Sequence, residues 1–114
     1  MYGVTIAELI VKMKLKNVTP EIDAEKVVLS HPDVNRPALQ LAGFFDHFDK
    51  DRVQIIGFVE QEYLRQMDPD RKKEMYDKLL AEHIPCLIFS RGFMPEEWLL
   101  ERCNYYDVPC MVSE

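Results

Sequence analysis

The sequence is poor in glycine and contains no glycine-rich motif. Its 114 residues include four glycines, which stand apart at positions 3, 43, 57 and 92. A P-loop needs the pattern G-x-x-x-x-G-K-[ST], because its backbone amides surround phosphate groups, and a dinucleotide site needs G-x-G-x-x-G. Neither pattern is present. We therefore expect this chain to hold no nucleotide and no other cofactor.

Cysteine is also scarce, and long apolar runs are missing. Cys86, Cys103 and Cys110 are odd in number and form no C-x-x-C pair, which argues against a disulfide framework or a zinc site. The histidines, His31, His47 and His83, show no metal-ligand spacing, so no metal site is expected. No run of about 18 apolar residues and no secretory signal is found. These features predict a cytoplasmic protein without a membrane partner, whose cysteines fill the core.

Positive charge is in deficit, with a formal net charge of −6. A nucleic-acid-binding protein needs a basic surface that displaces counterions from phosphates. The one unbroken run of three basic residues, 71–73, is flanked by Asp68, Asp70, Glu74 and Asp77. Mixed charges of this kind are typical of a solvated helix face. Nucleic acid is therefore excluded as a partner.

The length and the apolar share of 47% predict one compact domain over residues 1–114. Thr5 and Glu8 have the spacing of a capping box, which predicts a helix from Ile6 to about Lys14. Apolar spacing indicates a second helix over residues 58–67. Asp68 followed by Pro69 is a helix-start signal, and this helix should reach about His83. A fourth helix is expected to open at Pro95.

Four apolar runs are predicted as strands, at residues 26–29, 52–57, 84–89 and 108–112. The last three alternate with the predicted helices. Near-continuous apolar strands in such an alternation are typical of parallel sheets with right-handed crossovers. The predicted fold class is α/β, a single domain with a mostly parallel central sheet flanked by helices.

Ligands of open α/β sheets bind beyond the carboxyl ends of the parallel strands. Three features should meet there: Gly57, the tripeptide Ser90-Arg91-Gly92, and Ser113. The Arg91 guanidinium offers paired donors to a carboxylate or phosphate, and glycine at position 92 permits close backbone approach. The alternative is an ordinary βα turn whose arginine is tied to a nearby carboxylate. Both interpretations remain open.

Residues 30–48 are predicted to form an irregular segment, and such segments often carry binding groups. Within it, Arg36 either anchors its loop through an ion pair or contacts a ligand or partner. Three phenylalanines, Phe44, Phe45 and Phe48, are expected to pack as core and lid. Glu60 is expected to be a surface helix glutamate; it could act as an acid or base only if it were buried near a substrate. No nucleophile or acid–base pattern predicts a catalytic residue. The candidate ligand-binding residues are Asn35, Arg36, Gly57, Ser90, Arg91 and Gly92.

Several segments together resemble the N-terminal domain of HPr kinase/phosphorylase. The family pattern is close to N-R-P-G-L-x-L-A-G-F, R-I-Q-I-x-G-x-x-E, P-x-I-I-V-T-R-G and a late V-P. The matching stretches of this chain are residues 34–37, 41–45, 52–57 with Glu60, 84–92 and 108–109. Ala38 and Ser90 stand where the family often has glycine and threonine. Ala38 indicates that the backbone there does not need a left-handed conformation.

The resemblance implies a fold like that of the N-terminal domain of peptidoglycan-building Mur ligases. It also implies a bacterial, cytoplasmic, oligomeric protein that phosphorylates a serine of the phosphocarrier protein HPr, removes that phosphate, and regulates carbon catabolite repression. In the family, a C-terminal P-loop kinase domain binds ATP and magnesium. Because that domain is missing from this sequence, we expect a non-catalytic accessory, assembly or regulatory domain. Its expected partners are the kinase domain of the same or another chain, HPr, and a second copy. The alternative function is a free-standing sensor for a phosphorylated or carboxylated metabolite.

Overall fold

The central element of the fold is a five-stranded sheet of order β2-β7-β6-β5-β4. A computed structural model describes residues 3–31, 33–43, 45 and 48–114. The strands are β2 (Lys16–Asn17), β4 (Val34–Asn35), β5 (Val53–Ile56), β6 (Leu87–Phe89) and β7 (Cys110–Val112). Strands β4 to β7 are mutually parallel, and β2 joins β7 antiparallel. The predicted α/β domain with a mostly parallel sheet is therefore confirmed.

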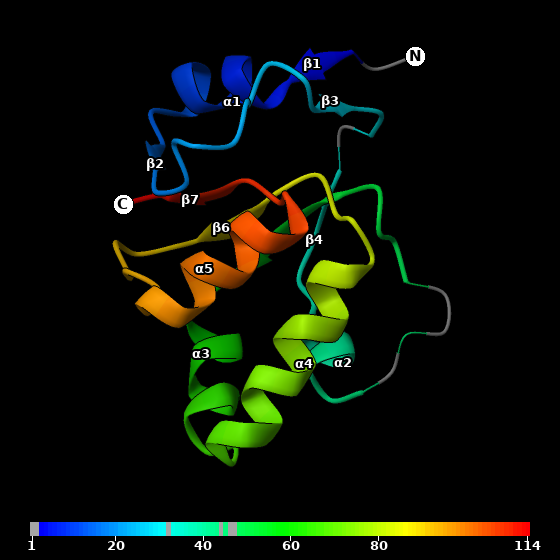
Figure 1. Ribbon diagram of the computed structural model, residues 1–114, viewed down its shortest axis with the longest axis vertical. Helices are drawn as coiled ribbons and strands as arrows, with labels where there is room; N and C mark the ends of the chain where they lie inside the picture. The colour runs from blue at the N-terminus through cyan, green and yellow to red at the C-terminus, as the bar shows by residue number, and fades with distance from the viewer. Residues whose placement is uncertain (1–2, 32, 44, 46–47) are drawn as a thin grey trace.

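Three layers are visible when the sheet is viewed along its edge (Figure 1). One face carries α1 (Ile6–Met13) and a small antiparallel pair, β1 (Val4–Thr5) with β3 (Val28–Leu29). The helices on the other side are α2 (Ala38–Leu41), α3 (Phe58–Arg65), α4 (Pro69–Ala81) and α5 (Glu97–Tyr106). Within the residues described, no helix is long and apolar enough to cross a membrane.

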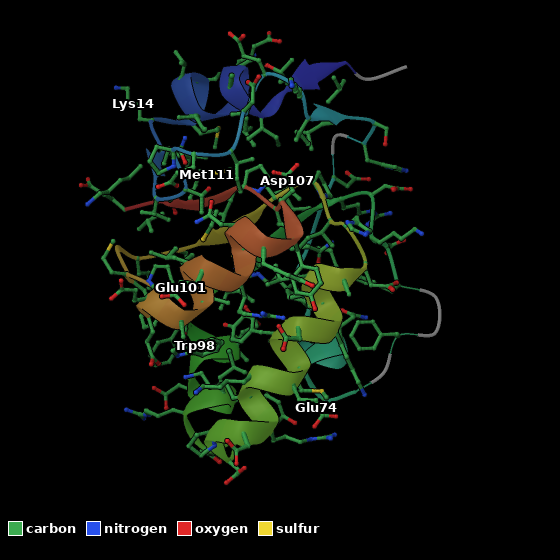
Figure 2. The ribbon with its side chains drawn as sticks, viewed as in Figure 1. Lys14, Glu74, Trp98, Glu101, Asp107 and Met111 are labelled. Atoms are coloured by element: carbon green, nitrogen blue, oxygen red, sulfur yellow. The ribbon has the colours of Figure 1, made fainter. Side chains whose placement is uncertain are left out.

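The alternation of side chains along the strands builds a core on each face of the sheet. Leu87 and Phe89 of β6 belong to the larger core, which α4 and α5 cover. Ile88 and Met111 point to the other face and pack with Ile6 of α1. Figure 2 shows Met111 between the sheet and the α1 layer. All three cysteines are buried and free, as predicted for core-filling residues.

The local signals at two helix starts act as predicted. Thr5 caps α1, because its hydroxyl accepts from the Glu8 amide at 3.1 Å while Glu8 accepts from the Thr5 amide at 3.2 Å. Asp68 caps α4, with Pro69 at the first helical position. The fourth predicted helix starts later than expected, since α5 begins at Glu97 and Glu96 is its N-cap.

One strand prediction is correct only in part, and the prediction of an irregular segment at residues 30–48 is wrong. Of residues 26–29 only Val28–Leu29 is a strand, and it pairs with β1 outside the central sheet. The segment predicted to be irregular contains both β4, which pairs parallel with β5, and the short helix α2. A two-residue strand leaves no periodic signal in the sequence, and its existence depends on pairing with a strand nearly twenty residues later.

Candidate functional site

Four chain segments end at the same edge of the sheet, which we call the carboxyl edge. Arg36 follows β4, Gly57 follows β5, Ser90 follows β6 and Ser113 follows β7. Because these strands are parallel, their carboxyl ends meet there, as predicted. The C-terminus and the loop from β6 to α5 mark this edge at the left of Figure 1. Arg36 and Arg91 therefore belong to the same edge.

Backbone hydrogen bonds tie the loops of the carboxyl edge together. The Ser90 amide donates to the Ile56 carbonyl at 3.1 Å, and the Ser113 amide donates to the Phe89 carbonyl at 2.8 Å. The Gly92 amide donates to the Ser113 carbonyl at 2.7 Å. These bonds continue the ladder of the sheet past the ends of its strands. The loops after β5, β6 and β7 are thus held in fixed relative positions.

Arg36, Gly57 and Glu60 form a compact cluster at this edge. The Glu60 carboxylate accepts from the Gly57 amide at 2.6 Å, and Arg36 Nη1 lies 3.8 Å from Glu60 Oε1. The Glu60 side chain is only 3% exposed, so the expectation of a surface glutamate is wrong. Its carboxylate sits at the N-terminal end of α3, where the helix dipole favours negative charge. The Arg36 side chain is 60% exposed, and among the described residues its guanidinium pairs with Glu60 alone.

Arg91 adopts a left-handed backbone conformation, with φ 58°, and Gly92 follows with φ 68°. The Arg91 guanidinium lies above the Phe58 ring, 5.4 Å from its centroid. This is cation–π geometry. Among the carboxylates that the structure describes, none forms an ion pair with Arg91. The turn therefore presents Arg91 on an aromatic ring rather than on a carboxylate.

The Asn35 side chain bonds a neighbouring strand of the sheet rather than pointing into solvent. Its amide donates to Gln54 Oε1 at 2.7 Å, and Gln54 Nε2 donates to the carbonyls of Asp49 and Arg52, each at 3.0 Å. Gln54 is fully buried. This network fixes β4 against β5, and it thereby positions the adjacent Arg36. Ser90 is also engaged, since its hydroxyl donates to the Ile56 carbonyl at 3.4 Å.

Apolar side chains near the two arginines were missed in the sequence. Phe58 and Val59 begin α3, and Phe93 and Met94 follow Gly92; all four are exposed. Their position in the sequence could have indicated them. Phe58 and Val59 directly follow Gly57, Phe93 and Met94 directly follow Gly92, and each glycine lies near the carboxyl end of a predicted strand. Of the phenylalanines predicted to pack, Phe48 lies against the larger core and contacts Phe45 edge to face. Phe44 and His47 lie outside the described residues.

The titratable core groups do not suggest acid–base chemistry. Burial raises the pKa of the Cys86 thiol, and a hydrogen bond with Cys103 together with burial raises the pKa of Cys110. Burial likewise raises the pKa of Tyr76. These groups stay protonated and serve packing. The carboxyl edge itself offers two guanidinium groups, exposed backbone and apolar surface, which suit binding.

Comparison with known proteins gives one consistent family. The family model described as HPr Serine kinase N terminus matches residues 4–114. A protein of Lachnoclostridium phytofermentans named HPr kinase/phosphorylase is 46% identical over all 114 residues. Proteins of the same name from Alkaliphilus metalliredigens and Caldicellulosiruptor bescii are 42% identical over 93% of the chain and 37% identical over its whole length.

The chain spans only part of these relatives. It covers 37% of the Lachnoclostridium and Caldicellulosiruptor proteins and 34% of the Alkaliphilus protein. The similarity therefore concerns one portion of a protein nearly three times as long.

Proposed function

Because this chain belongs to the family of HPr serine kinase N-terminal domains, we propose that it is the non-catalytic N-terminal domain of a bifunctional HPr serine kinase/phosphorylase. The match of residues 4–114 to the N-terminal family model carries this proposal. The sequence contains no P-loop motif, so we assign ATP, magnesium and phosphoryl transfer to a C-terminal kinase domain. The domain is an accessory domain, which contributes to assembly or regulation of the protein.

We propose the following setting for this protein. Its partners are the kinase domain and the phosphocarrier protein HPr, and a second copy of the protein in an oligomer. The protein works in the bacterial cytoplasm, and it controls carbon catabolite repression. The names of the relatives support HPr and a kinase domain as partners. We also propose that the sheet and helices share their arrangement with the N-terminal domain of Mur ligases, which the mostly parallel sheet supports.

A second candidate function is a sensor for a phosphorylated or carboxylated metabolite. The observation in its favour is that Arg36 and Arg91 follow strands of the same carboxyl edge, where Gly92 is exposed, whereas Gly57 is buried with its amide bonded to Glu60. In this function the arginines would bind the anionic group, and Asn35 and Ser90 would hold the loops in place. A thermal-shift series with sugar phosphates and inorganic phosphate tests it. A one-site ligand at 100 times its Kd stabilises by about 2.7 kcal/mol, and Arg91→Ala should abolish the shift.

A chimera tests the main proposal. In it, this chain replaces the aligned segment of the Lachnoclostridium relative, with which it shares 46% identity. We expect the chimera to phosphorylate HPr with ATP and magnesium, and the isolated 114-residue chain to form no phosphoserine. Assembly state and response to metabolites should follow the native relative. Phosphoserine formed by the isolated chain would contradict a non-catalytic role.

A further inference from the structure

Exposed apolar side chains and arginines gather at the carboxyl edge. We call this surface the carboxyl-edge patch and define it by its residues, which are Arg36, Phe58, Val59, Arg91, Phe93 and Met94. Phe58 is 56% exposed and Val59 is 64% exposed, although both belong to the first turn of α3. Single exposed apolar residues are ordinary on protein surfaces, but a contiguous group of them marks an interaction site.

Contacts join Arg36, Phe58 and Arg91, and the other members of the patch are their neighbours along the chain. Arg36 approaches the backbone of Gly57 so closely that a Cβ there would lie 2.8 Å from its Nη1. Phe58 follows Gly57 in the chain, and the Arg91 guanidinium lies over its ring. Phe93 packs on the buried Phe89, with 5.5 Å between ring centroids. The patch thus extends from the end of β4 to the loop after β6.

The loop that presents Arg91 is held in an uncommon backbone conformation. A left-handed φ at a residue other than glycine is unfavourable, and such residues persist where the surrounding structure fixes them, often at functional sites. Here the fixing bonds run from the Gly92 amide to Ser113 and from the Phe93 amide to Ser90. The patch is therefore preformed, which lowers the cost of ordering it on association.

The chain leads out of the structure beside this patch. Ser113 follows the last strand, and its carbonyl accepts the Gly92 amide of the Arg91 loop. Any polypeptide that continues past Glu114 therefore starts at the carboxyl edge. In the relatives, nearly two thirds of the protein lies outside the matched part. The short distance along the chain gives a following domain a high effective concentration at this surface.

The charge of the patch differs from that of the whole chain. The formal net charge is −6, yet both ionisable side chains of the patch are arginines. Glu60 pairs with Arg36 at 3.8 Å and offsets its charge, whereas no carboxylate that the structure describes pairs with Arg91. Arginine and aromatic side chains together are the residues that most often dominate protein interfaces. A partner surface with carboxylates among apolar side chains would complement them.

We propose that the carboxyl-edge patch is the surface on which the kinase domain of the same protein docks, through carboxylates flanked by apolar side chains. This inference rests on the proposed function, because the kinase domain is the partner which that function supplies. Docking at this edge places the kinase domain in contact with the loops after β5 and β6. An accessory domain would influence the kinase domain through these loops.

Hydrogen exchange of the chimera tests the docking surface directly. We compare residues 90–94 in the chimera and in the isolated chain, and expect exchange at least tenfold slower in the chimera. Val59→Asp should abolish this protection. Val11→Asp is the matched control, because Val11 is a helical valine on α1, outside the patch, and is 79% exposed. It should leave the protection intact, and both variants should keep the thermal unfolding midpoint of the isolated chain.

The outcomes separate the two proposals. Equal exchange in a chimera that phosphorylates HPr overturns the docking surface and leaves the proposed function standing. Protection in a chimera without kinase activity supports docking and contradicts the proposed function. Protection that appears in the isolated chain with rising protein concentration assigns the patch to a second copy and overturns the inference. Protection induced in the isolated chain by inorganic phosphate overturns it in favour of an anion site.

Discussion

Gly57 lies against the guanidinium of Arg36, and this contact leaves no room for a side chain at position 57. A Cβ there would be 2.8 Å from Arg36 Nη1 and 3.1 Å from Glu60 Oε1. The backbone of Gly57 has φ −100°, which any residue can adopt. The close approach of Arg36, rather than the backbone conformation, therefore favours glycine.

Gly57→Ala should displace Arg36 from Glu60. The guanidinium is the mobile end of an exposed side chain and can rotate away, so the loss of stability should be moderate, about 1 kcal/mol. Urea unfolding measures it. In an Arg36→Ala background the clash with Nη1 is gone, and the cost of the alanine should fall by at least about 0.5 kcal/mol. Strict additivity of the two substitutions would show that the two residues do not interact.

Glu60→Ala should destabilise the domain much more than loss of a surface glutamate. It removes the acceptor of the buried Gly57 amide, at a cost of about 1.5–3 kcal/mol for a hydrogen bond to a charged group. Glu60→Gln keeps an acceptor oxygen and should recover part of that loss. Glu62→Ala is the control on the same helix, since Glu62 makes an exposed ion pair with Arg65 worth about 0–1 kcal/mol. Equal losses at the two positions would contradict a structural role for Glu60.

The burial of Glu60 also shows what the sequence alone does not reveal. Local signals were sufficient for α1, where Thr5 and Glu8 are three residues apart, and for the start of α4 at Asp68. The three longest parallel strands, β5, β6 and β7, could be predicted because their apolar runs are long enough to recognise. Glu60 has the same three-residue spacing from Gly57, whose amide it accepts, but its burial and its ion pair with Arg36, 24 positions earlier, depend on tertiary packing.

The sequence likewise predicts only part of the candidate site. The convergence of Gly57, Arg91 and Ser113 follows from strand direction alone, which the alternation of strands and helices gave correctly. The position of the Arg91 side chain does not follow from strand direction. It depends on the Phe58 ring, which belongs to the preceding crossover and whose exposure is decided by tertiary packing.

Gln54 and Gln61 should respond in opposite ways to replacement by leucine. The fully buried Gln54 bonds Asn35 and the carbonyls of Asp49 and Arg52, so Gln54→Leu leaves buried polar groups without partners and should cost about 2–4 kcal/mol. The amide nitrogen of Gln61 is buried without a hydrogen-bond partner among the described residues.

Gln61→Leu should therefore be neutral or stabilising by about 1 kcal/mol, because it removes a desolvated donor. Chemical denaturation of the two variants under identical conditions measures both effects. A loss at position 61 as large as that at position 54 would mean that Gln61 has a partner in solution.

Glu96 should give the domain a stability contribution that depends on pH. Its carboxylate accepts from Trp98 Nε1 at 2.8 Å and from Lys72 Nζ at 3.3 Å, and these bonds, that of Trp98 foremost, hold the pKa of Glu96 below its ordinary value of 4.5. Lys72 belongs to α4, so its bond joins the two helices, whereas the Trp98 bond lies within the start of α5. Figure 2 shows Trp98 on α5. A carboxyl whose pKa is lowered by folding stabilises the folded state when it is ionised.

The contribution is therefore fully present above the unfolded value of 4.5 and disappears as the pH falls through the lower folded pKa. Wild type should exceed Glu96→Gln in stability at neutral pH by less than about 1 kcal/mol, since the exposed carboxylate is screened by solvent. The two proteins should converge as the pH falls below the folded pKa of Glu96. Trp98→Phe removes the stronger donor and should reduce the pH dependence. Urea midpoints of the variants across this range measure it, and a Glu96→Gln difference that does not change with pH would show that these bonds do not act on the ionised carboxylate.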